Sequence, residues 1–421
     1  MTDKKNYAVV TASYWGFTVT DGALRMLVLL HFHTLGYAPF DLALLFLLYE
    51  AMGILTNFFG GWIGARFGLR TTLIAGLSVQ IIALLMLAAL PASLGVTLSV
   101  AYVMAAQALS GIAKDLTKMS SKSAVKLVVD DTNQGLLFSW VAMLTGSKNA
   151  LKGLGFFLGG LLLETIGFSA ALAVMALALF LILMTAMPFL KADIGKAKTK
   201  IKGKELFSKS GQINYLSAAR IFLFASRDVW FVVALPVFLA SAAGWNFNRI
   251  GSFMALWVIG YGVMQALVPR FLAKTRTSQH AAVAARLWGI LLAVVTALLA
   301  FGLTDQADML FSQVFEKFSG ISWLLIGLVI FGFFFAVNSA LHSYLIVAYS
   351  DRDKVSLNVG FYYMANAVGR LAGTFFSGLI YQYYGLVACL LVSSSMVLMA
   401  VFFTLPLARP DPKKVSVNDE Y

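Results

Sequence analysis

The sequence SYWGFTVTDGALR, residues 13–25, lies in the middle of the first long apolar run of the chain, residues 7–35. The run is long enough to cross a bilayer, because a spanning helix needs about 20 mostly apolar residues. It nevertheless carries Asp21 and Arg25 near its centre, where a charge is costly unless it meets a partner or water. Residues four apart share one face of a helix, so these two side chains can pair. The stretch alone leaves two interpretations open: a structural ion pair, or a site for a charged substrate or a proton.

The composition extends this picture to the whole protein. Its 421 residues are 60% hydrophobic and 12% charged, whereas a soluble protein averages about 25% charged residues. The mean hydropathy of +0.83 also predicts a polytopic membrane protein. The single cysteine, Cys389, excludes an intramolecular disulfide and a multi-cysteine metal site. The N-terminus runs into the first span without a small-residue cleavage site, which indicates a retained helix.

The apolar runs predict an all-α protein with twelve transmembrane helices. Glycine, proline and short polar clusters separate these runs. The predicted spans are residues 7–35, 40–65, 71–91, 97–118, 136–164, 168–190, 213–240, 249–270, 280–303, 321–349, 355–382 and 386–408.

The distribution of basic residues predicts the orientation. If the N-terminus is cytoplasmic, the inside segments hold 22 lysines and arginines, and the outside segments hold only Arg249 and Lys317. The positive-inside rule therefore predicts a multi-pass protein of the cytoplasmic (inner) membrane with both termini in the cytoplasm. The net charge of +13 is then a topology signal that also attracts anionic lipid, and it does not indicate nucleic-acid binding.

A basic segment with seven lysines, residues 191–212, divides the chain into two halves. We expect an N-terminal six-helix bundle (1–190), a basic cytoplasmic linker (191–212), a C-terminal six-helix bundle (213–408) and a cytoplasmic tail (409–421).

Short internal matches indicate that the two halves are related. At a spacing of 208 residues Gly36 matches Gly244 and Arg66 matches Lys274, while Asp21 and Asp228 differ by one position. At a spacing of 218 residues Lys152 matches Arg370, and three glycine pairs coincide: Gly155/Gly373, Gly160/Gly378 and Gly167/Gly385. Two related six-helix halves are typical of secondary transporters, which bind substrate near the membrane midplane between the repeats.

The turn after the second span reads GWIGARFGLR, residues 61–70. It resembles the loop signature of the major facilitator superfamily at Gly61, Arg66, Gly68 and Arg70. This resemblance implies two pseudo-symmetric six-helix bundles and a cytoplasmic gate at this loop. Ala65 stands where the family has an acid, which implies a weaker or differently built latch. Independently of the family, glycine permits a tight turn here.

The glycines of the fifth span, in the sequence GLGFFLGG at residues 153–160, resemble a motif of superfamily antiporters, although its usual proline is missing. Plain helix packing on a small-residue face is the interpretation that we favour for them.

Two longer stretches carry a more specific resemblance. They are TASYWGFTVTDGALRMLVLLHFH, residues 11–33, and AKDLTKMSSKSAVKL, residues 113–127. Both are similar to the organoarsenical efflux permeases (ArsJ type) of this superfamily. The resemblance implies efflux of 1-arseno-3-phosphoglycerate, hence arsenic resistance. It also implies a functional link to a glyceraldehyde-3-phosphate dehydrogenase, which makes this ester when arsenate replaces phosphate. It assigns no site residues.

Charged residues inside the predicted spans favour an anionic cargo. Besides the inside and outside residues, the remaining basic ones are Arg25, Lys114, Lys148, Lys152, Arg220, Arg227, Arg286 and Arg370, and the clear intramembrane acids are Asp21, Glu50, Asp115 and Asp228. We expect Asp21 to pair with Arg25, Asp115 with Lys114 and Lys118, and Asp228 with Arg227. Because buried cations in excess of acids are unfavourable unless an anion or water meets them, this balance indicates an anionic substrate.

Five of these cations are the predicted substrate-binding residues: Arg25, Lys148, Lys152, Arg227 and Arg370. Lys148 and Lys152 share one helical face, and their mutual repulsion argues against a structural role. Arginine binds phosphate or arsenate oxygens through two parallel hydrogen bonds, which suits Arg227 and Arg370 near mid-span.

Other polar residues have predicted roles beside this site. The proton-coupling candidates are Asp21, Glu50 and Asp228. Burial and a nearby arginine shift the pKa of a carboxyl group in opposite directions, so its charge can change with its surroundings. We expect Asp21 to pair with Arg25 and to release it to the cargo. Lys114, Asn338 and His342 are secondary cavity candidates, although Lys114 and Lys118 also fit a solvated helix end. Arg220 and Arg286 are expected to extend to the membrane surface.

The sequence therefore predicts an exporter that works by alternating access, as a proton antiporter, with another small organic anion or sugar phosphate as the alternative cargo. A non-transporting receptor or an enzyme is disfavoured, because neither a soluble domain nor a nucleophile–base set is evident. The chain has no phosphate-binding Gly-Lys-Ser/Thr loop for ATP. We expect no cofactor, no metal, no nucleic-acid partner and a monomer in the lipid bilayer.

Overall fold

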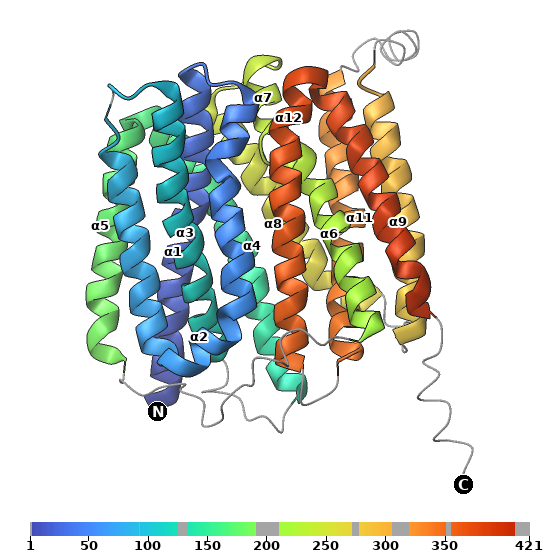
Figure 1. The fold of residues 1–421 in the computed structure, drawn as a ribbon, viewed down its shortest axis with the longest axis horizontal. Coiled ribbons are helices and arrows are strands. Elements are labelled where there is room, and N and C mark those ends of the chain that lie inside the picture. Colours follow the sequence, from blue (N-terminus) through green and yellow to red (C-terminus); the bar gives the residue numbers. More distant parts are fainter. Residues whose placement is uncertain are drawn as a thin grey trace.

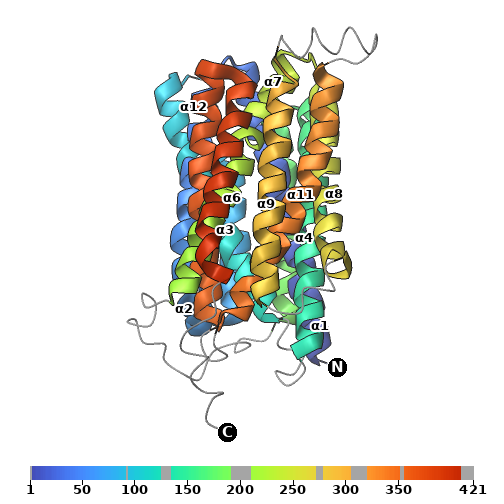
Figure 2. The same ribbon diagram turned by 90° about the vertical axis from the view of Figure 1, so that its right-hand side faces the viewer.

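The computed structural model describes residues 2–91, 93–124, 134–190, 210–271, 278–304, 320–350 and 355–408, and these residues form helices and short connections without strands. The helices run roughly parallel to one another and form one bundle (Figures 1 and 2). They are α1 (Thr2–Thr34), α2 (Pro39–Ala88), α3 (Val96–Ala124), α4 (Gln134–Ile166), α5 (Phe168–Ala186), α6 (Gly211–Phe231), α7 (Ala234–Ser241), α8 (Phe247–Phe271), α9 (Ser278–Phe301), α11 (Gly320–Ala348) and α12 (Val355–Thr404).

Glycines divide the two longest helices into two spans each. α2 and α12 are both 50 residues long, and their backbones leave the helical region at Gly68 (φ 76°) and Gly385 (φ 73°). Only glycine adopts such a positive φ without a steric cost. Figure 1 shows α2 and α12 each turning back on itself.

A proline breaks one further span, which consists of α6 and α7 together. Pro236 lacks an N–H group and clashes with the carbonyl four residues earlier, so it interrupts the helix on its N-terminal side. The backbone opens at Val233, and Ser377 Oγ on α12 accepts hydrogen bonds from the N–H groups of Val233 (3.2 Å) and Ala234 (3.1 Å). With α2 and α12 counted twice and α6–α7 once, the described helices give the twelve predicted spans.

The outer surface of the bundle is apolar. Large hydrophobic side chains such as Leu177, Leu256 and Val329 are 58%, 70% and 65% exposed, which suits contact with lipid. By length and composition alone, nine helical segments of the described part qualify as membrane-spanning. α1 and α4, with 33 residues each, are also long enough to span. The prediction of an all-α, multi-pass membrane protein is thus confirmed.

The first half of the chain (α1–α5) and the second half (α6–α12) make direct contacts at one end of the bundle. We use the term terminal end for the end of the bundle at which α1 begins and α12 ends (Figures 1 and 2). At the opposite end the halves touch directly: the Phe40 N–H donates to Gln382 Oε1 and the Asn248 N–H donates to Glu164 Oε2, both at 3.0 Å. The halves are therefore closed against each other at the opposite end.

The backbone supports the predicted internal repeat. In the described chain, positive φ angles occur at five glycines: Gly36 (82°), Gly68 (76°), Gly167 (79°), Gly244 (64°) and Gly385 (73°). Gly36 and Gly244 match at the 208-residue spacing, and Gly167 and Gly385 match at the 218-residue spacing. The two halves therefore turn at equivalent points. Because residues 191–209 lie outside the described part, the domain bounds stay a prediction.

Candidate functional site

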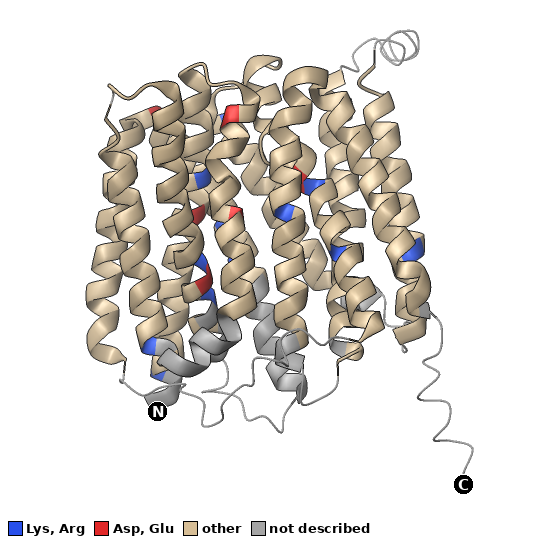
Figure 3. Cartoon of the chain, viewed as in Figure 1, with Lys and Arg blue, Asp and Glu red and all other residues tan. Residues whose placement is uncertain are grey.

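A buried carboxylate joins the two halves of the protein. Glu50 on α2 is 1% exposed. Its Oε1 atom lies 2.7 Å from Arg25 Nη2 on α1 and 2.5 Å from Arg370 Nη2 on α12. Charged residues occur along the helices of both halves (Figure 3). One oxygen of Glu50 thus holds an arginine from each half.

Two further ion pairs follow the internal repeat. In the first half Lys152 Nζ on α4 lies 3.7 Å from Asp21 Oδ2 on α1. In the second half Arg370 Nε on α12 lies 3.4 Å from Asp228 Oδ2 on α6. Lys152 and Arg370 are repeat partners, and Asp21 and Asp228 are partners to within one residue. Each half therefore sets a cation of its fifth span against an acid of its first span.

Small residues bring these helices together. A Cβ atom at Gly155 would lie 3.0 Å from Ala23 N on α1, and a Cβ atom at Gly373 would lie 2.7 Å from Asp228 Cβ on α6. The distance at Gly373 is shorter than a real Cβ contact, and the one at Gly155 would force its neighbour to shift, so glycine permits the approach at both positions. This geometry supports helix packing as the role of these glycines.

The predicted pair between Asp21 and Arg25 is wrong in this conformation. Arg25 reaches Glu50 instead, and its guanidinium carbon lies 5.1 Å and 5.6 Å from the ring centroids of Phe46 and Tyr49. Asp21 accepts a 2.5 Å hydrogen bond from the Tyr49 hydroxyl and faces Lys152. Helical spacing places Asp21 and Arg25 on one face, but contacts with other helices decide the partner of each.

The expected pair of Arg227 and Asp228 is present. Arg227 Nη2 and Nε lie 2.5 Å and 2.7 Å from Asp228 Oδ1. Asp228 is fully buried.

We use the term central network for Asp21, Arg25, Tyr49, Glu50, Lys152, Arg227, Asp228 and Arg370. Lys148, one turn from Lys152 on α4, is half-buried.

A second charged group lies beside the central network in the first half. Asp115 on α3 pairs with Lys118 at 2.6 Å and accepts a hydrogen bond from Thr56 Oγ1 on α2. Lys118 also donates to Asn57 Oδ1 at 2.6 Å, so it is engaged with α2 and is not only a solvated helix end. Lys114 Nζ lies 3.9 Å from the ring centroid of Tyr49, whose hydroxyl bonds Asp21. The predicted candidate Lys114 therefore contacts the central network.

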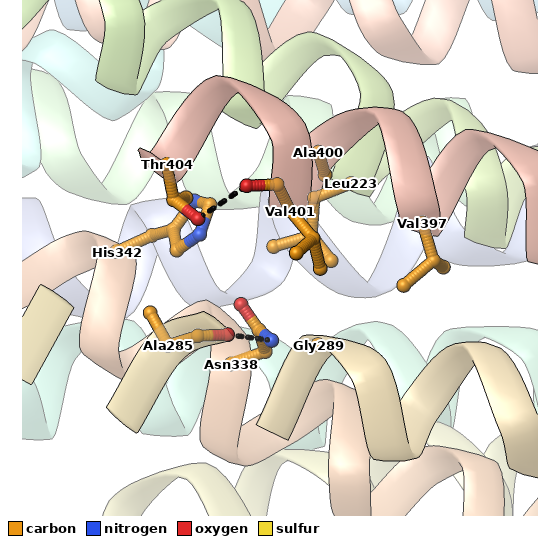
Figure 4. A pocket seen from close by; sticks show the side chains of 9 residues that line it. All are labelled: Leu223, Ala285, Gly289, Asn338, His342, Val397, Ala400, Val401 and Thr404. Carbon is orange, nitrogen blue, oxygen red and sulfur yellow. Dashed lines mark hydrogen bonds between the residues drawn. The ribbon is translucent and has the colours of Figure 1, made fainter. Parts of the chain in front are cut away.

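The other two secondary candidates lie elsewhere. Asn338 and His342 line a narrow cavity inside the second half, among side chains of α6, α9, α11 and α12 (Figure 4). Asn338 Nδ2 donates to Ala285 O at 3.0 Å. The three secondary candidates consequently do not form one site.

The position of the Arg220 side chain differs from the predicted one. It does not extend to the membrane surface: it is 4% exposed, and Nη1 donates to Ser339 O and Oγ at 3.3 Å and 3.2 Å. The surrounding helices α6, α8, α11 and α12 enclose this position. Arg286 donates to Leu405 O at 3.1 Å.

The loop signature is only partly described. Gly68 forms the break in α2, and Arg70 follows it as a half-buried side chain. The side chain of Arg66, like the surroundings of Gly61, lies outside the described part of the chain. A gate at this loop stays a prediction.

Sequence reasoning missed the neutral partners of these charges. Tyr49, Thr56, Asn57 and Ser339 each bond or contact a charged side chain. Their sequence signal is weak, since it consists only of polar groups inside apolar runs. Tyr49 has one additional signal, its position next to Glu50.

The site carries more positive than negative charge. Its cations are Arg25, Lys114, Lys118, Lys152, Arg227 and Arg370, and its acids are Asp21, Glu50, Asp115 and Asp228. With all groups ionised, the described side chains leave two positive charges without a matching acid. Such a surplus between apolar helices attracts an anion.

Comparisons with known proteins agree with this architecture. The family model described as Major Facilitator Superfamily matches residues 8–311 and 216–420. No curated protein matches the chain.

Solved structures of similar fold include the human organic anion transporter MFSD10 (TETRAN), with 16% identity, 96% of this chain and 99% of that chain covered, and a TM-score of 0.63. A D-xylose-proton symporter has 13% identity, coverage of 97% and 98%, and a TM-score of 0.69. A bacterial homologue of the iron transporter ferroportin, in an inward-facing state, has 15% identity, coverage of 97% and 99%, and a TM-score of 0.64.

At these identities the likeness shows the fold alone, and the finer resemblance to organoarsenical efflux permeases stays a prediction. The family model, however, matches nearly the whole chain, and the twelve spans of the described part and their repeat fit it. The chain belongs to the major facilitator superfamily and is a multi-pass membrane transporter.

Proposed function

We propose that the protein exports a small organic anion by alternating access and binds it in the central network. One observation carries this proposal: Arg25 and Arg370, from opposite halves, converge on a single oxygen of Glu50. An anionic group in place of that carboxylate would contact both halves at once. Secondary transporters of this architecture bind substrate between their halves near the midplane and then rock the halves around it.

The cations have complementary roles in this proposal. Arg25 and Arg370 bind the oxygens of the anion through their planar guanidinium groups. Lys152 and Arg227 add positive charge from α4 and α6. Lys148 lies one turn away on α4 and meets the anion on its path.

The acids hold these cations when no cargo is bound. Glu50 occupies Arg25 and Arg370, Asp21 faces Lys152, and Asp228 occupies Arg227. Protonation of one of these three acids would release its cation to the cargo. Proton antiport is therefore the proposed coupling. Export from inverted vesicles that is unchanged when the proton gradient is collapsed would contradict it.

The proposed cargo is an organic arsenate ester, 1-arseno-3-phosphoglycerate, so that the protein confers arsenic resistance together with a glyceraldehyde-3-phosphate dehydrogenase. Support comes from the two stretches that resemble organoarsenical efflux permeases. They contain Asp21 and Arg25 of the central network, and Lys114, Asp115 and Lys118 beside it. The excess of cations also suits a cargo with several negative charges.

The proposed direction is from the cytoplasm outward, in the cytoplasmic (inner) membrane with both termini inside. The basic connecting segments support this orientation. Export then requires the contacts at the opposite end, Phe40 with Gln382 and Asn248 with Glu164, to separate. The loop at Gly61, Arg66, Gly68 and Arg70 lies at the terminal end, where the proposed cytoplasmic gate would close.

Cells that lack arsenic efflux provide the test. They would express the chain with and without the dehydrogenase, and arsenate resistance and exported arsenicals would be measured. Resistance in the pair alone supports the arsenate ester. Resistance in neither, with the protein inserted in the membrane, would contradict this cargo and favour another small organic anion or sugar phosphate, which the same cations could bind.

A further inference from the structure

Arg220 on α6 is a buried cation outside the central network. Besides its two hydrogen bonds to Ser339, its Nε atom is buried and has no hydrogen-bond partner. Its guanidinium carbon lies 4.0 Å and 4.8 Å from the ring centroids of Phe224 and Tyr362. A guanidinium group buried among apolar side chains with one N–H unpaired is costly, unless an anion or water accepts a hydrogen bond from that N–H.

Arg220 also lacks a counter-charge. Among the described residues no carboxylate lies within ion-pair distance of it, and the four acids of the spans face other cations. His342, one turn from Ser339 on α11, is 1% exposed, and its Nδ1 atom has no hydrogen-bond partner. Arg220 and His342 together offer unused polar groups inside the second half.

The surroundings of Arg220 form a defined polar cluster. Ser339 Oγ also receives hydrogen bonds from Tyr261 Oη (3.4 Å) and Gln265 Nε2 (3.3 Å) on α8. Side chains of α6, α8, α11 and α12 therefore meet at this point. We use the term Arg220 cluster for Arg220, Tyr261, Gln265, Ser339, His342 and Tyr362.

A single aromatic ring connects this cluster to the central network. Arg220 and Arg227 are seven residues apart, which is about two turns on the same face of α6. Their guanidinium carbons lie 4.0 Å and 4.9 Å from the ring centroid of Phe224, which stands between them in sequence. The two guanidinium groups cannot be farther apart than the sum of these distances. A three-carbon chain with an acidic group at each end can bridge such a gap.

We propose that Arg220 forms a second anion subsite, so that the transporter prefers short organic anions with an acidic group at each of two ends. One acidic group binds the central network where Arg227 and Arg370 share Asp228, and the other binds Arg220. The inference rests on the proposed function, since it assumes that the first group occupies the central network. It adds a preference for two-headed anions, which a single cluster of cations does not explain.

Two commercial probes differ only in the second acidic group. 3-Phosphoglycerate carries a phosphate and a carboxylate, whereas glycerol 3-phosphate carries the phosphate alone on the same three-carbon chain. Isothermal titration calorimetry on the purified full-length protein in detergent would give both affinities. A hydrogen bond to a charged group contributes enough for roughly tenfold tighter binding of 3-phosphoglycerate by the wild type. Equal affinities for the two probes would overturn the second subsite, and this comparison needs no variant.

Variants locate the preference. Arg220→Gln is expected to weaken 3-phosphoglycerate about tenfold, to the affinity of glycerol 3-phosphate, and to leave glycerol 3-phosphate unchanged. Ser339→Ala is the matched control: it removes a partner of Arg220 but keeps the cation, so the preference should persist. Equal weakening of both probes by Arg220→Gln would mean that Arg220 acts through the structure, and would overturn the proposal.

A different result marks failure of the proposed function. Arg370→Gln should weaken both probes, because it removes the group that binds the shared phosphate. Unchanged binding of both probes in Arg370→Gln would place the anion outside the central network. Wild-type protein that binds neither probe would contradict the anion site itself, and with it the second subsite.

Discussion

Replacing Glu50 with glutamine removes the negative charge between Arg25 and Arg370 and keeps the shape of the side chain. In the wild type one carboxylate oxygen accepts from both guanidinium groups at 2.7 Å and 2.5 Å. The three side chains are 1%, 9% and 17% exposed, so water screens them poorly. In Glu50→Gln the two arginines face each other across a neutral amide.

The magnitude follows from this burial. Removing one partner of a buried ion pair costs about 3–5 kcal/mol, because the other charge stays buried without compensation. The amide carbonyl still accepts a hydrogen bond and recovers about 1 kcal/mol of that loss. The empty variant should therefore be less stable than the wild type by roughly 2–4 kcal/mol. An anion that takes the place of the carboxylate should restore this stability.

Thermal unfolding of the purified protein, with and without 3-phosphoglycerate, measures both effects. A ligand at 100 times its Kd stabilises the folded state by about 2.7 kcal/mol. In the wild type the anion must first displace Glu50, so its net effect is smaller. We expect a lower melting temperature for the empty Glu50→Gln variant and a larger increase on adding the anion. Export by the variant should fail, because no carboxylate replaces the anion and releases it.

The matched control is Glu164→Gln. Glu164 is exposed at the opposite end of the bundle, where its Oε2 atom accepts from the Asn248 N–H. The same substitution there should leave the response to the anion unchanged. Suppose Glu50→Gln were as stable as the wild type without anion and responded no more strongly to it. Glu50 would then not occupy the anion site, and displacement of its carboxylate by the anion would be refuted.

Three further predictions concern other parts of the structure. Lys152→Gln and Arg370→Gln should each abolish export in vesicles while membrane insertion, checked by fractionation, is preserved; wild-type transport by both would exclude the proposed site. Gly385→Ala should lower the melting temperature, because it forces a φ of 73° on a residue with a Cβ, which costs about 1–2 kcal/mol. Gly260→Ala is the control and should not lower it, because a Cβ atom there meets no atom within 4 Å. Ser377→Ala should destabilise the protein by about 1–3 kcal/mol for each N–H group of the α6–α7 break left unsatisfied, and an unchanged melting temperature would contradict the capping role.

The sequence predicted the spans well because each depends on local information. An apolar run of sufficient length must be a helix in a bilayer, where every backbone polar group needs an internal partner. The glycines Gly68 and Gly385 mark the turns for a similarly local reason, their positive φ. The pair of Arg227 and Asp228 could be expected because the two residues are adjacent.

The partners across helices could not be predicted in the same way. Helical spacing gives the face on which Arg25 lies, but not the helix that covers this face, so its bond to Glu50 was not evident. Arg220 was assigned to the membrane surface from its place near the end of a span. A span that is largely apolar on all sides does not reveal which of its faces the other helices, here α8, α11 and α12, enclose.

The internal repeat explains why Glu50 has a special position among the acids. The pairs Lys152–Asp21 and Arg370–Asp228 occur in both halves, so they belong to the common architecture. At the 208-residue spacing, by contrast, Val258 is the counterpart of Glu50, and Val233 is the counterpart of Arg25.

The contact between Arg370 and Glu50 therefore has no symmetric equivalent. In the described chain Lys152 meets an acid of its own half, whereas Arg370 meets acids of both halves. Two related halves that rock about a midplane site need a contact that differs between the loaded and the empty state. Glu50 provides one such contact, and a single anion or a single proton at this carboxylate is sufficient to release it. The asymmetry of the repeat thus leads to the same residue as the geometry of the site.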